Sequence, residues 1–487
     1  MIDKIKAKLE GASEPAKASI TFTLCSICQK GIAFCAVPIY TRIMSQANFG
    51  YYTIFLSWMQ IIAVIATLNL SYHVYMNGML KYENDRDGYT SAMFGLSSLI
   101  TLLVFCVYLA AEGFWNQVLG LPTAFVVLMF LEILLQPSYE YWSAYQRFQF
   151  KYKALAALTL GIAFIVPIVS IPLISYVSEE FKGLAAIAAK VGVTIIGYAI
   201  PMVMILSKLK KLYNREYWTF ALKFNIPLIP HFLSAIIFQQ CDRLMIRDIC
   251  GDADVAMYSV AFSLSTIMTI VNTAIMNSMI PWTYQNMKKK NYEQIHNVAK
   301  MLCLLVATIN MLIIFIAPDV MKILAPAEYS DGVYVIAPLI VSVYFMFTVN
   351  LFVNIEYYYA QVKYVMFGSI AAAVANVILN YIFINRFGFI AAGYTTLISY
   401  ILYTYGHYVF MKIVLKKQVG DNVSVYDSKF ILLLGGGMLL LSLVCSLLFQ
   451  TTIIRYAFLA VILTVLFAKR KTIVENLQMM KAAKECG

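Results

Sequence analysis

The sequence is short of charge, since Asp, Glu, Lys and Arg make up only 13% of its 487 residues. Hydrophobic residues make up 61%, well above the roughly 45–50% of a soluble domain. The apolar runs are each about 18 to 25 residues long, enough to cross a bilayer, and no connection between them is long enough to hold a soluble domain. The composition therefore excludes an ordinary globular protein and indicates a polytopic membrane protein.

Motifs for several kinds of chemistry are also absent. There is no Walker A loop, no nucleophile elbow and no cluster of metal ligands, so ATP hydrolysis, covalent catalysis and a bound metal have no basis in the sequence. The nine cysteines lie mostly within apolar runs, and Cys25 and Cys28 form a CxxC inside a membrane segment, where small packing residues are expected. We expect no cofactor.

The N-terminus lacks the hydrophobic core and the cleavage site of a signal peptide. Ile2, Ile5 and Leu9 instead predict a short amphipathic helix in the first 17 residues, on the cytoplasmic surface. After it, the pattern predicts an all-α fold of about fourteen transmembrane helices. Their approximate ranges are 18–41, 50–71, 89–111, 117–138, 154–177, 183–206, 223–249, 254–280, 298–317, 332–353, 364–384, 388–411, 429–449 and 451–468.

The net charge of +12 follows the predicted topology and does not point to a nucleic-acid partner. With a cytoplasmic N-terminus, most of the 37 Lys and Arg residues fall on the cytoplasmic side, as the positive-inside rule requires. Both termini are therefore predicted to be cytoplasmic. The external side receives only Arg42, Lys182, Arg243, Arg247, Lys322, Arg386 and Arg455.

The chain contains an internal repeat of about two hundred residues. Thr41-Arg42-Ile43-Met44 at the end of the first helix resembles Asp242-Arg243-Leu244-Met245 at the end of the seventh. Helices 6 and 12 both begin with glycine and alanine residues. The segments that begin at Glu140 and at Glu356 also resemble each other. We therefore expect two parallel six-helix lobes, related by an axis along the membrane normal.

The repeat predicts the following division of the chain. The N-terminal lobe covers 1–206, a basic cytoplasmic linker 207–222, the C-terminal lobe 223–414, two added helices 429–468, and a cytoplasmic tail 469–487. The segment 223–249 carries Pro227 and Pro230, which free backbone carbonyls and predict a kinked or bent helix. His231 beside them is expected to be a hydrogen-bonded structural residue.

Cations inside the membrane are candidates for the substrate site, because an ionisable group in a bilayer needs a partner or a hydrated cavity. Lys30 lies near the middle of the first helix, and we interpret it as lining a cavity that attracts anions, with a structural ion pair as the alternative. The same two interpretations apply to Lys190 on helix 6. Arg42 and Arg243 occupy matching positions near the external mouth. Arg247 lies one helical turn beyond Arg243.

The carboxylates of these helices have more than one interpretation. Arg243 and Arg247 can contact an anion, pair with Asp242 and Asp248, or do both. Glu132 on helix 4 and Glu356 on helix 10 are candidates for carrying a coupling H⁺ or Na⁺, or for balancing the lysines. The candidate substrate residues are thus Lys30, Lys190, Arg42, Asp242, Arg243 and Arg247.

Three blocks together resemble the bacterial polysaccharide-transport (Wzx-type) flippases of the multidrug/oligosaccharidyl-lipid/polysaccharide exporter superfamily. They are Pro38-Ile39-Tyr40-Thr41-Arg42 with Phe49-Gly50, Ile226-Pro227-Leu228-Ile229-Pro230-His231 leading to Asp242-Arg243-Leu244-Met245-Ile246, and Phe387-Gly388 with Ala391-Ala392-Gly393. The similarity covers roughly residues 15 to 415. It implies two six-helix lobes in the bacterial inner membrane and translocation of undecaprenyl-pyrophosphate-linked sugars from the cytoplasmic to the external leaflet.

Three functions agree to different degrees with the charges and the loops of this sequence. A flippase for an O-antigen, capsule or exopolysaccharide unit fits the buried cations, which suit an anionic pyrophosphate, and it would act beside a polysaccharide polymerase and glycosyltransferases. The alternative is a cation-coupled multidrug or small-molecule exporter, although such exporters would more naturally carry an acid in the first helix, where this chain has Lys30. A membrane glycosyltransferase or polymerase would need a long external or carboxylate-rich loop, which is absent, so we expect a transporter and not an enzyme.

Overall fold

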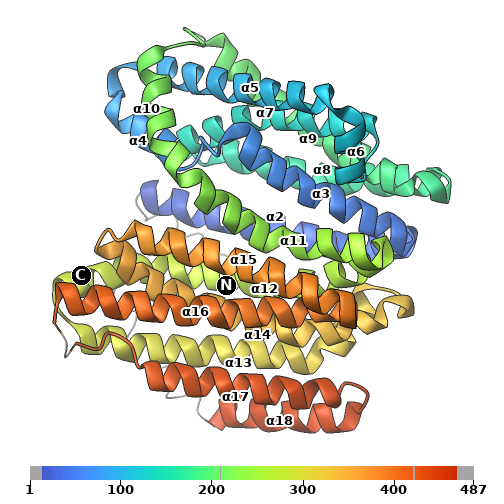
Figure 1. The fold of residues 1–487 in the computed structure, drawn as a ribbon, viewed down its shortest axis with the longest axis vertical. Helices are drawn as coiled ribbons and strands as arrows, with labels where there is room; N and C mark the ends of the chain where they lie inside the picture. The colour runs from blue at the N-terminus through green and yellow to red at the C-terminus, as the bar shows by residue number, and fades with distance from the viewer. Residues whose placement is uncertain (1–13, 209, 421–422, 469–487) are drawn as a thin grey trace. The chain divides into compact units, whose positions relative to one another are not determined.

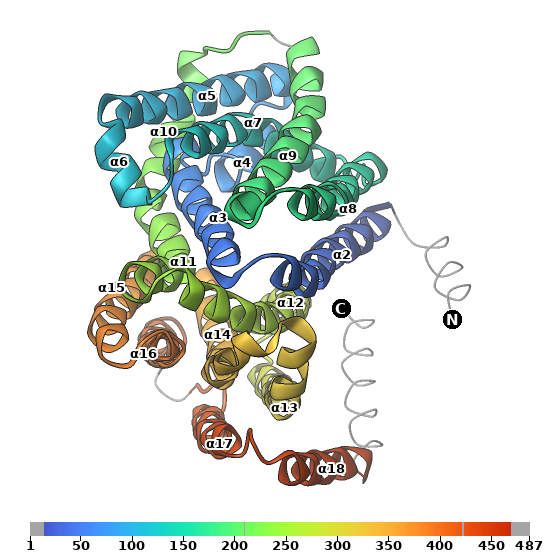
Figure 2. The same ribbon diagram turned by 90° about the vertical axis from the view of Figure 1, so that its right-hand side faces the viewer.

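The computed structural model describes residues 14–208, 210–420 and 423–468, and these residues form helices joined by short connections, with no strand among them (Figures 1 and 2). Most of the predicted N-terminal amphipathic helix and all of the tail 469–487 lie outside the described residues. The chain divides into two compact units, unit 1 from Met1 to Leu244 and unit 2 from Met245 to Gly487.

Unit 1 contains the helices that precede the middle of the chain. They are α2 (Glu14–Ile43), α3 (Gln46–Thr67), α4 (His73–Lys81), η1 (Glu83–Asp85), α5 (Arg86–Ala110), α6 (Glu112–Leu119), α7 (Thr123–Phe148), α8 (Lys153–Tyr176), η2 (Glu179–Phe181), α9 (Lys182–Ser207), α10 (Arg215–Asn225), η3 (Ile226–Leu228) and most of α11 (Ile229–Cys250).

Unit 2 contains the helices that follow. They are α12 (Asp252–Lys288), α13 (Tyr292–Leu324), η4 (Ala327–Gly332), α14 (Val333–Tyr358), α15 (Val362–Phe387), α16 (Ile390–Gln418), α17 (Ser428–Leu447) and α18 (Thr452–Ala468).

The predicted all-α membrane fold is confirmed. Among the described residues, 12 helices are long and apolar enough to cross a membrane. The predicted spans 388–411 and 451–468 also exist as helices, α16 and α18. They stay outside the set of twelve because α18 is short and because many Tyr, Thr and Ser side chains lower the hydropathy of α16. About fourteen predicted spans therefore agree with the observed helices.

Short helices in the connections had no signal in the hydrophobic pattern. The structure adds α4, α6 and α10, which are too short or too polar to read as membrane spans. The predicted helix 223–249 is interrupted, since α10 ends at Asn225 and a 3₁₀ turn over Ile226–Leu228 leads into α11. This break coincides with Pro227, whose ring cannot donate the backbone hydrogen bond of a continuous helix.

The two units repeat one packing arrangement. In unit 1, α9 packs against both α7 and α8, and in unit 2, α16 packs against both α14 and α15. These are the fourth, fifth and sixth spans of each predicted lobe, so their packing agrees with the predicted repeat. Contacts divide the chain within α11, at Leu244, whereas the repeat divides it at the linker 207–222. The repeat-based division stays a prediction.

Unit 2 is built around α14, the most buried of the candidate spans. Side chains of three neighbouring helices donate hydrogen bonds to its backbone carbonyls. Asn310 Nδ2 of α13 reaches Ile340 O at 3.1 Å, Asn272 Nδ2 of α12 reaches Val343 O at 2.9 Å, and Thr404 Oγ1 of α16 reaches Phe345 O at 3.2 Å. Such bonds satisfy buried polar groups where no water is present, and they fix the position of α14.

Candidate functional site

A buried ion pair joins the fourth and sixth spans of unit 1. Lys190 Nζ of α9 lies 2.5 Å from Glu132 Oε1 of α7, and their side chains are 16% and 4% exposed. The ammonium also lies 3.4 Å from Met59 Sδ of α3. The lysine therefore has a carboxylate partner inside the unit, which is the charge-balancing arrangement that was one of the two interpretations of Glu132. Its role in substrate binding stays a prediction.

One oxygen of this pair has no partner. Glu132 Oε2 is buried and accepts no hydrogen bond among the described residues. Burying an acceptor without a donor costs free energy unless a further group or a proton satisfies it. Glu132 Oε2 is therefore an acceptor whose donor is absent from the described residues.

A second carboxylate on the same helix is held by neutral groups. Glu140 Oε2 accepts a hydrogen bond from Ser71 Oγ at 2.5 Å, and its Oε1 accepts one from Gln136 Nε2 at 2.7 Å. The sequence singled out Glu140 only as a marker of the repeat. Its two-donor environment differs from that of its counterpart Glu356.

Glu356 pairs with a histidine that the sequence analysis did not single out. His407 Nδ1 of α16 lies 2.8 Å from Glu356 Oε1 of α14, and both side chains are fully buried. Tyr403 and Phe410 lie edge-on to the imidazole, with ring centroids at 4.7 and 5.9 Å. The outer atoms, Glu356 Oε2 and His407 Nε2, have no hydrogen-bond partner among the described residues.

A glycine makes room for this histidine. A Cβ atom placed on Gly368 of α15 would lie 2.4 Å from His407 Nε2 and 2.8 Å from its Cε1. Any larger residue at this position would displace the imidazole. Sequence spacing alone gives no signal for the pair, because 51 residues separate Glu356 from His407.

The predicted cations of α2 have different surroundings. Lys30 is half-buried, and no hydrogen bond or ion pair to its ammonium is found in the part of the chain that the structure describes. Arg42 is exposed at the end of α2, where its Nη1 donates to Pro38 O at 2.7 Å. This contact is local to the last two turns of α2. The roles of Lys30 and Arg42 in substrate binding stay predictions.

The residues predicted on α11 take part in local contacts. Arg243 Nη1 lies 3.0 Å from Gln240 Oε1, and Gln240 Nε2 donates to Gln60 Oε1 of α3 at 3.1 Å. Asp242 is 2% exposed. These contacts connect α11 to α3 within unit 1, so part of the predicted structural role of Arg243 is present.

Arg247 has a different acidic partner from those considered in the sequence. Its Nε lies 3.4 Å from Asp252 Oδ1, at the start of α12. Asp248 is exposed. Pairing with Asp242 and Asp248 was one of the expectations, and the structure shows a pair with Asp252 across the turn at Gly251, which has a φ of +103°.

The structure thus brings together only some of the predicted residues. Lys190 and Glu132 form one pair, and Glu356 lies in another pair with His407. No group of three or more His, Cys, Asp and Glu residues that could hold a metal ion occurs among the described residues. The two pairs and Lys30 are the candidate functional groups.

Known structures share this fold. The chain is similar to a structure of the lipid II flippase MurJ in an inward closed conformation, with a TM-score of 0.66 and 13% identity over 93% of this chain and 100% of that one. It is also similar to an inward-facing multidrug resistance MATE family transporter of the MOP superfamily, with a TM-score of 0.60 and 15% identity over 80% of this chain and 96% of that one. At these identities, the similarities show a common fold.

Sequence comparisons identify the family. The chain is 24% identical over 160 residues to Lsg locus putative protein 1 of Haemophilus influenzae, an alignment that covers 32% of this chain and 40% of that relative. Residues 16–287, more than half of the chain, match the polysaccharide biosynthesis protein family. The predicted family resemblance is thereby confirmed, and the chain belongs to the polysaccharide biosynthesis protein family.

Proposed function

We propose that this protein is a flippase that moves an undecaprenyl-pyrophosphate-linked oligosaccharide across the bacterial cytoplasmic membrane by alternating access. The substrate would be a repeat unit of O-antigen, capsule or exopolysaccharide, and it would leave chemically unchanged. The family match over residues 16–287 is the observation that carries the proposal. The fold that the chain shares with a lipid II flippase supports transport of a lipid-linked substrate.

The charged groups inside the membrane support an anionic substrate. Lys30 has no counter-ion among the described residues, so its ammonium is available to a pyrophosphate. Lys190, by contrast, already has Glu132 beside it. The pyrophosphate would therefore contact Lys30 first, and Arg42, Lys190, Asp242, Arg243 and Arg247 would make or shape secondary contacts.

Transport against a gradient needs an energy source, and we propose coupling to H⁺ or Na⁺. The Glu356–His407 pair is our candidate in unit 2, because carboxyl and imidazole groups are the usual proton carriers of transporters and each has an outer atom without a partner among the described residues. The hydrogen bond between Glu356 and His407 favours H⁺ over Na⁺. One carboxylate oxygen already contacts His407, so only the other oxygen could bind Na⁺, and a hard cation needs several oxygen ligands.

The proposal also covers the location and the partners of the protein. We place both termini in the cytoplasm and the protein in the inner membrane, as the distribution of Lys and Arg predicts. A polysaccharide polymerase and glycosyltransferases would be its functional partners, and no enzymatic activity of its own is required.

Deletion of the gene in its host, followed by complementation, tests this proposal. We expect the deletion strain to lose a surface polysaccharide and to accumulate the lipid-linked oligosaccharide in the inner leaflet. Restoration of both by the plasmid-borne chain would support a flippase. Normal surface polysaccharide in the deletion strain would contradict the proposal.

A second candidate, a cation-coupled multidrug exporter, is favoured by the similarity to a MATE transporter. The same deletion strain separates the two functions, because loss of an exporter would increase drug susceptibility and leave the surface polysaccharide intact. Lys30 in the first helix argues against this candidate, since an ammonium with no ionic partner among the described residues would repel cationic drugs.

A further inference from the structure

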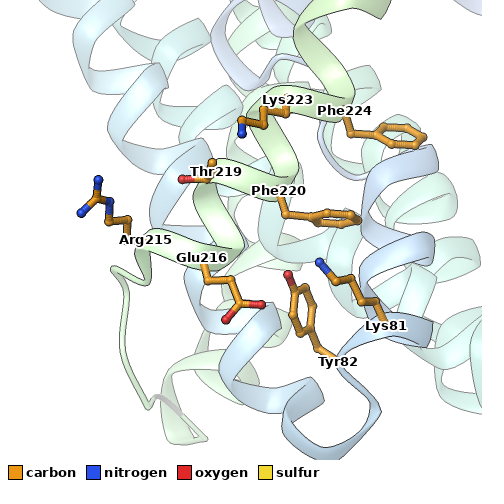
Figure 3. A pocket seen from close by; sticks show the side chains of 8 residues that line it. All are labelled: Lys81, Tyr82, Arg215, Glu216, Thr219, Phe220, Lys223 and Phe224. Carbon is orange, nitrogen blue, oxygen red and sulfur yellow. The ribbon is translucent and has the colours of Figure 1, made fainter.

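A groove lies within unit 1 between the end of α4 and the face of α10. Its volume is about 820 Å³, and its walls include Lys81 and Tyr82 on one side and Arg215, Glu216, Phe220 and Lys223 on the other (Figure 3). These residues belong to the segments 81–82 and 215–224, which the charge distribution predicts to be cytoplasmic. None of them belongs to the candidate site described above.

The helix that forms one wall is firmly attached to unit 1. Trp218 Nε1 of α10 donates to Ala92 O of α5 at 2.8 Å, and Tyr217 OH donates to Asp85 Oδ2 at 3.0 Å. At the far end of the helix, Asn225 Nδ2 donates to Leu68 O. The α10 wall of the groove is therefore held in place by contacts within unit 1.

Its charge is positive and locally ordered. The Lys81 ammonium lies 4.5 Å from the centre of the Phe220 ring and 4.8 Å from that of Tyr82, which holds the long side chain between the two walls. Lys223 and Arg215 add two more cations, and Glu216 is the acid among the lining residues (Figure 3). The groove thus has an excess of two positive charges.

Exposed apolar side chains lie next to these cations in the chain, and Phe224 also lines the groove. Leu80 is 62% exposed, Phe224 36% and Ile226 53%. Cations next to exposed apolar groups match the boundary between lipid headgroups and acyl chains, where amphipathic helices lie. Basic pockets on the cytoplasmic side of membrane proteins bind anionic headgroups.

We propose that this groove binds an anionic phospholipid of the cytoplasmic leaflet, with a phosphatidylglycerol-type headgroup. The phosphodiester would contact Lys81 and Lys223, the acyl chains would lie along Phe224 and Ile226, and a headgroup hydroxyl would donate to Glu216. A single phosphodiester fits better than a lipid diphosphate, because Glu216 would repel a second phosphate. The proposal depends on the predicted cytoplasmic side and not on the transported substrate.

Retention of lipids by the purified full-length protein tests this site. Detergent-solubilised protein would be exchanged with phosphatidylglycerol or phosphatidylethanolamine, and bound lipid would be counted by native mass spectrometry. We expect wild type to retain phosphatidylglycerol preferentially. The variant K81Q/K223Q should bind phosphatidylglycerol at least fivefold more weakly. A fivefold loss is about what the removal of one lysine near an anionic headgroup causes.

The control removes the same charge elsewhere. K151Q/K153Q changes two exposed lysines on the same predicted side, just before and at the start of α8, and should leave retention unchanged. Should K81Q/K223Q fail to fold, the single variant R215Q, at an exposed position, is expected to give a smaller loss in the same direction. Circular dichroism and thermal unfolding would verify the fold of each variant.

Two results would overturn the proposal. Equal losses in the groove variant and the control would show that only general surface charge matters. A groove variant that keeps phosphatidylglycerol but loses a polyprenyl diphosphate would show that the groove receives the transported lipid instead. The second result leaves the proposed flippase function intact, so the two proposals can fail separately.

Discussion

His407 Nδ1 lies 2.8 Å from Glu356 Oε1, at a position where both side chains are fully buried between α14 and α16. Unit 1 has a corresponding pair, because Lys190 of α9 contacts Glu132 of α7 at 2.5 Å. Each pair connects the fourth and sixth spans of its lobe. The pairs nevertheless occupy different heights along their helices, since the sequence repeat aligns Glu356 with Glu140, two turns beyond Glu132.

Replacing Lys190 alone is expected to destabilise unit 1. Lys190→Met would leave the Glu132 carboxylate buried without its partner, which typically costs about 3–5 kcal/mol. The double variant Glu132→Gln/Lys190→Met removes both charges and should recover most of that loss. Thermal unfolding in detergent measures the difference, and equal melting temperatures for the single and double variants would contradict a coupled pair.

The same double variant tests whether Lys190 contacts the substrate. A purely structural pair predicts that transport recovers together with stability. If Lys190 binds the pyrophosphate, the double variant will be stable but inactive in assembly of surface polysaccharide. The two roles are therefore separated by comparing protein level with polymer level in the same strain.

Coupling to H⁺ predicts a specific defect in Glu356→Gln. The amide can still accept a hydrogen bond from His407 Nδ1 but cannot exchange a proton. We expect flipping of a labelled lipid-linked oligosaccharide in proteoliposomes to lose its acceleration by an imposed pH gradient. Glu140→Gln, a membrane carboxylate held by Ser71 and Gln136, is the matched control and should keep the acceleration. An unchanged response in Glu356→Gln would assign coupling elsewhere.

Gly368→Ala tests the packing around the same pair. The added Cβ would lie 2.4 Å from His407 Nε2, so the imidazole must move, and overpacking of this kind costs about 1–3 kcal/mol. Gly406→Ala on α16 is the control, because its Cβ would meet no atom within 4 Å. Alanine favours a helix over glycine by about 1 kcal/mol, so the control should melt no lower than wild type. A Gly368→Ala variant as stable as the control would contradict the close approach.

Lys30 is the first residue to replace in a test of substrate binding. It has no ionic partner among the described residues, so Lys30→Ala removes a cation without leaving a buried carboxylate behind. We expect normal amounts of protein in the membrane and loss of the surface polysaccharide. Lys30→Arg keeps the charge and should retain part of the activity. Unchanged polymer in Lys30→Ala would remove this residue from the site.

The main features of the fold could be predicted because membrane insertion imposes a strong pattern. Each span must bury its backbone polar groups in a helix and cover them with apolar side chains, which gives long runs that are visible in any window. The short helices α4, α6 and α10 lie in connections and obey no such rule. α10 is fixed by specific hydrogen bonds of Tyr217 to η1 and of Trp218 to α5, which spacing cannot reveal.

The candidate site was less predictable for a related reason. Sequence analysis identifies an ionisable group inside a span, such as Lys190 or Glu356, because the cost of burial makes it unusual. It does not identify the partner, because that residue lies on another helix at a register set by packing. Arg247 illustrates the difficulty, since its partner is Asp252 across a turn and not the nearer Asp248.

Asp427, outside the membrane spans, predicts a pH-dependent stability of the start of α17. Its Oδ1 accepts the Phe430 N–H at 3.0 Å, and His296 Nε2 and Lys300 Nζ lie 3.7 and 3.6 Å from its Oδ2. The backbone hydrogen bond first, and then the two basic side chains, lower the pKa of this carboxyl below its ordinary value. The stabilisation is therefore complete above the unfolded pKa of about 3.9 and is lost as the pH falls through the lower folded pKa.

Asp427→Asn keeps the capping oxygen but removes the charge, so hydrogen exchange in the first turn of α17 should be faster than in wild type at pH 7. The difference should shrink as the pH approaches 3, and a difference independent of pH would mean that the charge of Asp427 contributes nothing there.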